Sequence, residues 1–279
     1  MKKITAAFDG LKFSKSTRDY AIYLSKQTST HLVGAFMDDS TYSSYKIYDL
    51  IVNQGVSAER LKAFEEKDAA TRNAAAETFE NPASRQSSEY SIHHNRNFAI
   101  QALKHESIYT DLLVIDSKET FAHHKEELPT RFIRDLLSDT QCPVLLVPQK
   151  YSPVKKIILL YDGEPSSVHA IKMFSYLLPE LKHLDTEVIS VNSTGTSLHL
   201  PDNKLMKEFM KRHYPKAKYT ILKGIAEDTI VNHLKKQQEN TLIVLGAYRR
   251  STVSRWFRES MADVLMKETK LPLFIAHNK

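Results

Sequence analysis

Two aspartates occupy equivalent places in two similar stretches of the sequence. Residues Ile4–Gly10 read ITAAFDG and residues Ile157–Gly163 read IILLYDG, so Asp9 and Asp162 each follow a short apolar run and precede a glycine. Ligands of parallel sheets bind outside the carboxyl ends of the strands, which makes both carboxylates candidates for ligand contact, Asp162 before Asp9. The alternative interpretation is a turn residue whose carboxylate caps the following helix.

A cationic loop in the second half is the next candidate. The segment Tyr248–Arg258 carries four arginines and Trp256, and Ser260 follows at the expected start of a helix. A helix N-terminus beside arginines favours an anionic ligand or an acidic partner. The alternatives are a solvated loop with Trp256 packed onto the domain and a surface for single-stranded nucleic acid, which no recognition motif supports. The arginines are Arg249, Arg250, Arg255 and Arg258.

Other kinds of site find little support. The chain has seven glycines and neither a GxGxxG nor a GxxxxGK[ST] phosphate-binding fingerprint. His93 and His94 would point to opposite faces of a strand, and no HExxH or CxxC motif accompanies them or His123–His124, so we expect no metal site. Cys142 is the only cysteine, which excludes an internal disulfide. With no Ser-His-Asp group and no carboxylate pair, we expect no enzyme, and a slow ATPase stays the open alternative.

These residues must be positioned by strands and helices that alternate in the same order in both halves. Such alternation is typical of βαβ units and a parallel sheet, and near-continuous apolar strands indicate helices on both faces. Strands are predicted at Ile4–Phe8, Leu32–Met37, Glu89–His93, Leu112–Ile115, Val144–Val147, Ile157–Tyr161, Glu187–Val191, Lys218–Leu222, Thr241–Leu245 and Leu273–Ala276. Helices are predicted at Ser14–Lys26, Ser57–Glu80 (ended by Asn81–Pro82), Phe98–His105, Leu128–Ser138, Ala170–Leu177, Lys204–His213, Glu227–Lys236 and Met261–Thr269.

The bulk properties fit a tandem of two domains. The repeat of about 150 residues is the length of a whole domain, so the 279 residues are predicted to form domains at 1–150 and 151–279. Residues 1–150 hold 19 Lys+Arg against 20 Asp+Glu, and residues 151–279 hold 20 against 13. This basic excess favours an anionic ligand or an acidic partner for the second half, or only solubility. Without a signal peptide or a membrane-spanning run, a cytoplasmic location without membrane association is expected.

Several motifs follow the same order in both halves: AAFDG and LLYDG at the first strand, LIVLGAYRRS at the fourth strand of the second half, and the closing CPVLLVP and LPLFIA. Together they resemble the motifs of the universal stress protein family. The resemblance covers nearly the whole chain. It implies an α/β fold of two tandem doubly wound domains, each with a five-stranded, mostly parallel sheet of the adenine-nucleotide alpha-hydrolase-like kind. It also implies pairing of the two domains through their last strands and a binding or regulatory role in stress response. Whether two chains form a homodimer stays open.

One branch of that family binds ATP through a Gly-x2-Gly-x9-Gly-Ser/Thr loop after the fourth strand. In the second half this pattern falls on Gly246, Arg249, Glu259 and Ser260, so two of the three glycines are replaced. A Cβ then stands where main chain must approach phosphates, and Glu259 repels them, which Arg249 offsets in part. The resemblance therefore implies that the second half is degenerate as an ATP site.

The first half departs further from the same pattern. Asp116 stands at the first glycine position, Glu119 at the second, and Pro129–Arg131 replaces the closing Gly-Ser. Two acids and no glycine argue against a triphosphate there. The Tyr-rich segment Ser40–Tyr48 has no counterpart of equal length in the second half, and we expect a connection that covers the sheet edge, with a lid or partner surface as the alternative.

The predicted ligand site therefore lies in the second half. By the resemblance, Asp162 and Val191 lie on the adenine side, and Gly246, Arg249 and Ser260 lie toward the phosphates; an ordinary buried valine explains Val191 equally well. No cofactor is required, and an adenine nucleotide in the second domain stays open. The leading hypothesis is a binding or regulatory module. The alternatives are an ATP- or AMP-binding switch and a scaffold that docks an acidic protein partner.

Overall fold

The computed structural model of the chain describes residues 1–37, 58–86, 89–122, 125–192, 199–246 and 260–276. Three stretches considered above lie outside the described residues: Ser40–Tyr48, His123–His124 and the arginine loop with Glu259. The predictions that concern them, including the role of Arg249, therefore stay predictions.

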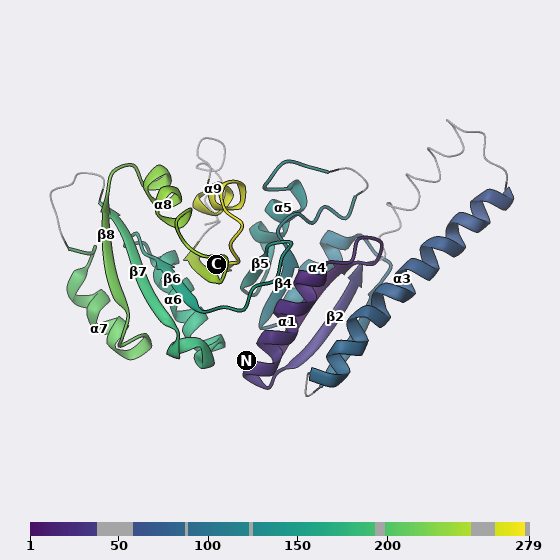
Figure 1. Cartoon of the computed structure of the whole chain (residues 1–279), viewed down its shortest axis with the longest axis horizontal. Coiled ribbons are helices and arrows are strands. Elements are labelled where there is room, and N and C mark those ends of the chain that lie inside the picture. The colour runs from purple at the N-terminus through teal and green to yellow at the C-terminus, as the bar shows by residue number, and fades with distance from the viewer. Residues whose placement is uncertain (38–57, 87–88, 123–124, 193–198, 247–259, 277–279) are drawn as a thin grey trace.

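The described strands form one ten-stranded sheet, in the order β3-β2-β1-β4-β5-β10-β9-β6-β7-β8 (Figure 1). Neighbouring strands are parallel except β5 and β10, which pair antiparallel with Phe274 opposite Leu145 and so join the two halves. The strands are β1 (Lys3–Asp9), β2 (His31–Met37), β3 (Tyr90–Asn95), β4 (Leu112–Asp116), β5 (Val144–Val147), β6 (Lys156–Leu160), β7 (Asp185–Asn192), β8 (Lys218–Lys223), β9 (Thr241–Gly246) and β10 (Leu273–Ala276).

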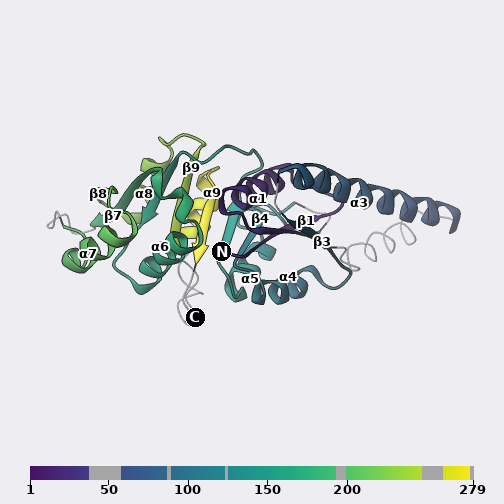
Figure 2. The ribbon, with the colours of Figure 1, turned by 90° about the horizontal axis from the view of Figure 1, so that it is seen from below.

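Helices lie on both faces of the twisted sheet (Figure 2). One buried core packs α1, α3, α6 and α7 against the strands, and a second core packs α4, α5, α8 and α9 against the other set of strand side chains. Strands such as β4 and β5 are therefore buried along their whole length. The helices are α1 (Lys15–Thr28), α3 (Ala58–Gln86), α4 (Ala99–Ile108), α5 (Arg131–Asp139), α6 (Pro165–Leu177), α7 (Asn203–His213), α8 (Ala226–Leu234) and α9 (Met261–Glu268), with a 3-10 helix η1 (Pro179–His183).

The predicted fold class is confirmed. The predicted strands and helices occur in the predicted order, and the last strand of each half, Val144–Val147 and Leu273–Ala276, has its predicted bounds. The 3-10 helix Pro179–His183 was not predicted. The domain boundary at residue 150 stays a prediction, since one sheet runs continuously through both halves. None of the described helices is both long and apolar enough to cross a membrane.

The predicted end of the long helix at Asn81–Pro82 is wrong. Helix α3 continues to Gln86 with Pro82 inside it. Proline is costly inside a helix because it lacks an N–H and crowds the preceding turn. Phe79 and Ala83 on either side of it are fully buried, so tertiary packing holds the last turn of the helix in place.

Candidate functional site

A small cavity, here called the second-half pocket, opens at the carboxyl ends of β6, β7 and β9. Its volume is about 150 Å³, and Asp162, Val191 and Gly246 all line it. These three predicted site residues belong to the turn after β6, the end of β7 and the last position of β9. The structure thus brings them together. The other lining residues are Leu160, Tyr161, Ser167, Ile189, Ala226, Ile230, Leu245 and Met261.

Asp162 is an exposed residue that shapes the turn between β6 and α6. Its Oδ1 accepts the N–H of Glu164 at 2.9 Å, and Asp9 makes the same contact with the N–H of Leu11 at 2.8 Å. Both aspartates are therefore turn residues that bond the backbone two positions on. Neither caps the following helix, because Ser14 is the N-cap of α1 and Glu164 that of α6. The exposed carboxylate of Asp162 stays available to a ligand.

Gly246 is required by packing as well as by any ligand. A Cβ at this position would lie 2.4 Å from the carbonyl carbon and oxygen of Ser166 and 2.8 Å from the nitrogen of Ser167. The end of β9 thus touches the backbone of the first turn of α6. The predicted role of Gly246 near phosphates is untested by this contact, but the glycine has a structural reason of its own.

Ser260 is the N-cap of α9. Its Oγ accepts the N–H of Asp263 at 3.2 Å, and the carboxylate of Asp263 accepts the N–H of Ser260 at 3.4 Å, which completes a capping box. Arg134 of the first half approaches the same carboxylate, with 3.9 Å between its Nε and Oδ1. The start of α9 already has its own anionic group, which makes it a weaker site for a phosphate.

Several residues of the second-half pocket were missed by the reading of the sequence. Ala226 and Ile230, one turn apart on α8, form one wall, and Met261 at the start of α9 forms another. The signal that was available is their place in the repeat: Ala226 and Met261 each begin a helix that follows a strand, at the edge of the sheet where Asp162 lies, and Ile230 is one turn further along α8.

The strand register identifies the equivalent site in the first half. Ile4 of β1 pairs with Leu112 of β4, and the equivalent Ile157 of β6 pairs with Leu242 of β9. Four positions further along β4 and β9, Asp116 stands at the position of Gly246. The same count on β2 and β7 places Met37 at the position of Val191. The alignment of Asp116 with the glycine position, made from the sequence, therefore agrees with the geometry.

Three buried carboxyl groups occupy the first-half site. Asp9, Asp116 and Glu119 are 3%, 9% and 7% exposed. Asp116 accepts the hydroxyl of Ser14 at 2.9 Å, and Glu119 Oε1 accepts the next two backbone N–H groups. Oδ2 of Asp9 is buried and has no hydrogen-bond partner. A buried carboxylate oxygen without a partner favours the protonated form.

Burial dominates the titration of two of these carboxyl groups, Glu119 and Asp9. It raises the pKa of Glu119 to about 7, and the neighbouring charge of Asp9 acts in the same direction. Burial likewise raises the pKa of Asp9. Lys12, Lys118 and Lys125 line a cavity of about 430 Å³ beside Asp116 and Glu119, together with Glu126. The innermost groups are acids, so the first-half site favours protons over a phosphate.

The described part of the chain offers no candidate metal site. No cluster of three His, Cys, Asp or Glu side chains there could hold a metal ion. Nδ1 of His93 instead lies 2.9 Å from Oε1 of Glu106, and Cys142 is a buried cysteine that forms no disulfide.

No family model matches the sequence, and no curated protein matches it. Solved structures match it over its whole length. A universal stress protein from Archaeoglobus fulgidus DSM 4304 has a TM-score of 0.65 and 13% identity, covering 99% of this chain and 96% of that protein. The chain has the fold of a tandem universal stress protein. A putative universal stress protein from Pseudomonas aeruginosa UCBPP-PA14 has a TM-score of 0.61 and 15% identity, covering 99% and 92%.

The universal stress protein fold thus extends through both halves of the chain. A functionally unknown protein from Pseudomonas aeruginosa PAO1 also shares it, with a TM-score of 0.60 and 14% identity over 99% of this chain and 92% of that one. The resemblance inferred from the repeated motifs is confirmed for the fold. At these identities the likeness says nothing of a ligand, which must be argued from the pocket itself.

Proposed function

We propose that this chain is a cytoplasmic, non-enzymatic universal stress protein that acts as a binding module in stress response. Its small-molecule site is the second-half pocket, and the ligand is an adenine nucleoside or its monophosphate. The observation that supports this is the convergence of Asp162, Val191 and Gly246 on one pocket at the carboxyl ends of the strands.

The lining of the second-half pocket suits a flat apolar base that carries hydrogen-bond donors. Leu160, Ile189 and Ile230 supply apolar walls, and Asp162 can accept a hydrogen bond from an amino group or a ribose hydroxyl. Among the described lining residues Asp162 is the only charged one, and its carboxylate repels phosphates. The volume of about 150 Å³ is smaller than a typical small-molecule site, so we expect it to enclose the base alone.

The first half is proposed to bind no nucleotide. Asp116 stands where the second half has Gly246, and Glu119 and Asp9 add two more buried carboxyl groups. A phosphate placed there would meet like charges in a site with little water, where the repulsion is weakly screened.

Isothermal titration with adenosine, AMP and ATP tests this proposal. We expect adenosine and AMP to bind one site per chain, and ATP to bind about tenfold more weakly or worse. Val191→Phe should abolish binding because its ring fills the pocket. Asp162→Asn keeps the turn acceptor but removes the charge, so it should narrow the gap between AMP and ATP. Val168→Phe, on the opposite face of the sheet, is the matched control and should bind normally.

The same titration separates the alternatives. ATP binding as tight as that of AMP, with Mg²⁺-dependent phosphate release, would favour the ATP switch and contradict our proposal. Binding that survives Val191→Phe would place the ligand elsewhere. If none of the three compounds binds, the nucleoside site is excluded.

A scaffold for an acidic partner is the second candidate. The observation in its favour is the uneven charge, since residues 151–279 carry 20 Lys+Arg against 13 Asp+Glu. Binding to poly-glutamate that weakens steeply as the salt concentration rises from roughly 50 to roughly 300 mM would support this candidate, because added salt shortens the Debye length and screens the attraction. Absence of binding at the low-salt end would remove it.

A further inference from the structure

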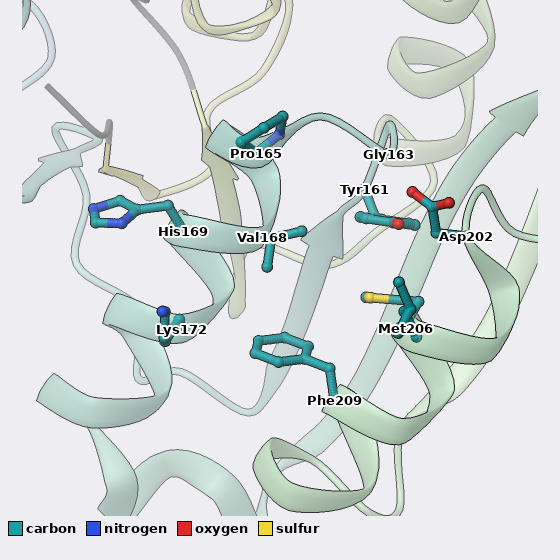
Figure 3. Close-up of a pocket in the computed structure, with 10 residues that line it drawn as sticks. Tyr161, Gly163, Pro165, Val168, His169, Lys172, Asp202, Met206 and Phe209 are labelled. Carbon is teal, nitrogen blue, oxygen red and sulfur yellow. The ribbon is translucent and has the colours of Figure 1, made fainter.

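A second cavity of the second half lies between α6 and α7 and has a volume of about 430 Å³. Val168 from α6 and Met206 and Phe209 from α7 project into the space between the two helices (Figure 3). These side chains belong to the core on one face of the sheet, whereas the second-half pocket is walled by Leu160 and Ile230 on the other face. The volume of this α6–α7 cavity lies within the usual range for small-molecule sites.

The corresponding space in the first half is filled by aromatic rings. Phe8 stacks on Phe13 and Phe36, with ring centroids 4.8 and 5.2 Å away, and Phe79 of α3 lies 5.5 Å from Phe8. Phe8 of β1 pairs with Phe36 of β2 in the strand register. The same register in the second half places Ser190 of β7 at the position of Phe36. Ser190 is buried, and a small side chain in place of a ring leaves this face of the sheet less filled in the second half.

The charges around the cavity are also specific to the second half. Lys172 lies on α6 and Asp202 at the start of α7, on opposite sides of the space in Figure 3. Within the described residues, neither side chain makes a hydrogen bond or an ion pair. Counted from the helix N-caps Ser14 and Glu164, the buried apolar residue Ile22 stands in the first half at the position of Lys172. An unpaired lysine beside an apolar cavity favours an anionic group on an apolar ligand.

The mouth of the cavity supports the same interpretation. Leu205 lines it and is 67% exposed, which is unusual for a large apolar side chain. His169, three positions before Lys172 on α6, is another lining residue, and its pKa is lowered by burial and then by the charge of Lys172. The positive charge of Lys172 therefore acts on His169, which lines the cavity.

We propose that the α6–α7 cavity binds a small amphipathic monocarboxylate, either aromatic or a medium-length alkyl chain. Its apolar body lies among Val168, Met206 and Phe209, and its carboxylate faces Lys172. Asp202, across the cavity, disfavours a second carboxylate but accepts a hydrogen bond from a hydroxyl group. This ligand is different from the proposed nucleoside and occupies a different pocket, so either proposal can fail alone.

Three probes of equal chain length test the proposal on the full chain: decanoate, decanol and decanedioate. Spectra of protein labelled with ¹³C in the methionine methyl groups report where they bind, with the Met206 signal assigned through Met206→Leu. We expect decanoate to shift the Met206 signal and to leave that of Met37 in the first half unchanged. Decanedioate should bind at least about tenfold more weakly than decanoate, and Asp202→Asn should reduce that difference.

Variants then separate the charge from the cavity. Lys172→Gln should weaken decanoate about tenfold and leave decanol unchanged, and Lys62→Gln on the exposed surface of α3 is the charge-matched control. Val168→Phe should abolish binding of both probes by filling the space, whereas Val191→Phe should not. Leu205→Glu changes only the exposed mouth of the cavity. It replaces Val168→Phe in this test if circular dichroism shows that Val168→Phe does not fold.

Two outcomes would overturn the assignment of the ligand to this cavity, and a third would overturn the role of Lys172. One is the absence of a Met206 shift with decanoate at millimolar concentration. The other is a shift that Lys172→Gln, Val168→Phe and Leu205→Glu all leave intact. Equal affinity for decanoate and decanol in the wild-type protein would refute the assigned role of Lys172.

Discussion

Arg18 on α1 donates a hydrogen bond from Nη1 to the carbonyl oxygen of Thr78 on α3, 3.2 Å away and 60 positions along the chain. That carbonyl is the one that Pro82, four residues later, cannot bond because it has no N–H. The guanidinium supplies the missing donor. A tertiary contact therefore satisfies the backbone group that the proline frees, and α3 continues past it to Gln86.

The first prediction is that Arg18 and Pro82 are energetically coupled. Arg18→Ala should lower the free energy of unfolding by about 2 kcal/mol, since hydrogen bonds to charged groups contribute about that much. In the Pro82→Ala background, residue 82 has an N–H for the Thr78 carbonyl, and the same change should cost less than half as much. Urea unfolding of the four proteins gives the coupling energy, and equal costs in both backgrounds would contradict the assignment.

The second prediction concerns Glu119, whose pKa is raised to about 7 from an ordinary value of 4.5. A raised pKa means that the folded protein holds the proton more tightly than the unfolded chain. Its contribution to stability is therefore fully present below pH 4.5 and is lost as the pH rises through about 7. Between these limits the loss is roughly 3 kcal/mol.

Glu119→Gln isolates that effect because the amide oxygen can still accept the two backbone N–H groups. The free energy of unfolding of the variant should exceed that of the wild type at pH 8, and the advantage should shrink or reverse at pH 5. Glu59→Gln on the exposed surface of α3 is the control and should follow the wild type at both values. A constant difference between Glu119→Gln and the wild type across this range would contradict the buried carboxyl assignment.

The third prediction is that Gly246→Ala destabilises the protein with no ligand present. The added Cβ would meet the backbone of Ser166 at 2.4 Å, and a helix backbone cannot move aside as a flexible side chain can. We expect a loss of about 3 kcal/mol in urea unfolding, at the upper end of overpacking costs. Asp162→Asn at the opposite wall should stay within about 0.5 kcal/mol of the wild type, as is usual for surface changes. An unchanged free energy of unfolding in Gly246→Ala would contradict the close contact between residue 246 and the backbone of Ser166.

The fold could be predicted from the sequence because its signals are local and repeated. Ile4–Gly10 and Ile157–Gly163 show the same apolar run before Asp-Gly, and continuous apolar runs placed strands such as Val144–Val147. The end of α3 could not be predicted in this way. Whether Pro82 ends the helix depends on Phe79 being buried and on the donor Arg18 in α1, and neither is a local property.

The candidate site was predicted in part, for a similar reason. Asp162, Val191 and Gly246 end strands, and strand ends of a parallel sheet meet at one edge, so order along the chain was sufficient to group them. The α6–α7 cavity was not predicted. It lies on the face of the sheet where Ser190 replaces Phe36 of the first half. Its walls come from α6 and α7, and α3, the counterpart of α7 in the first half, has a different sequence.

The last prediction separates the helix-capping role of Ser260 from a phosphate-binding one. Ser260→Ala removes the acceptor for the N–H of Asp263 and should lower the free energy of unfolding by about 1 kcal/mol. Asp263→Asn keeps an acceptor for the N–H of Ser260 and should cost less. Because each of these side chains already accepts the backbone N–H of the other residue, Ser260→Ala should leave adenosine and AMP affinity within about twofold of the wild type. A larger loss for AMP than for adenosine in titration calorimetry would instead show that the hydroxyl contacts a phosphate.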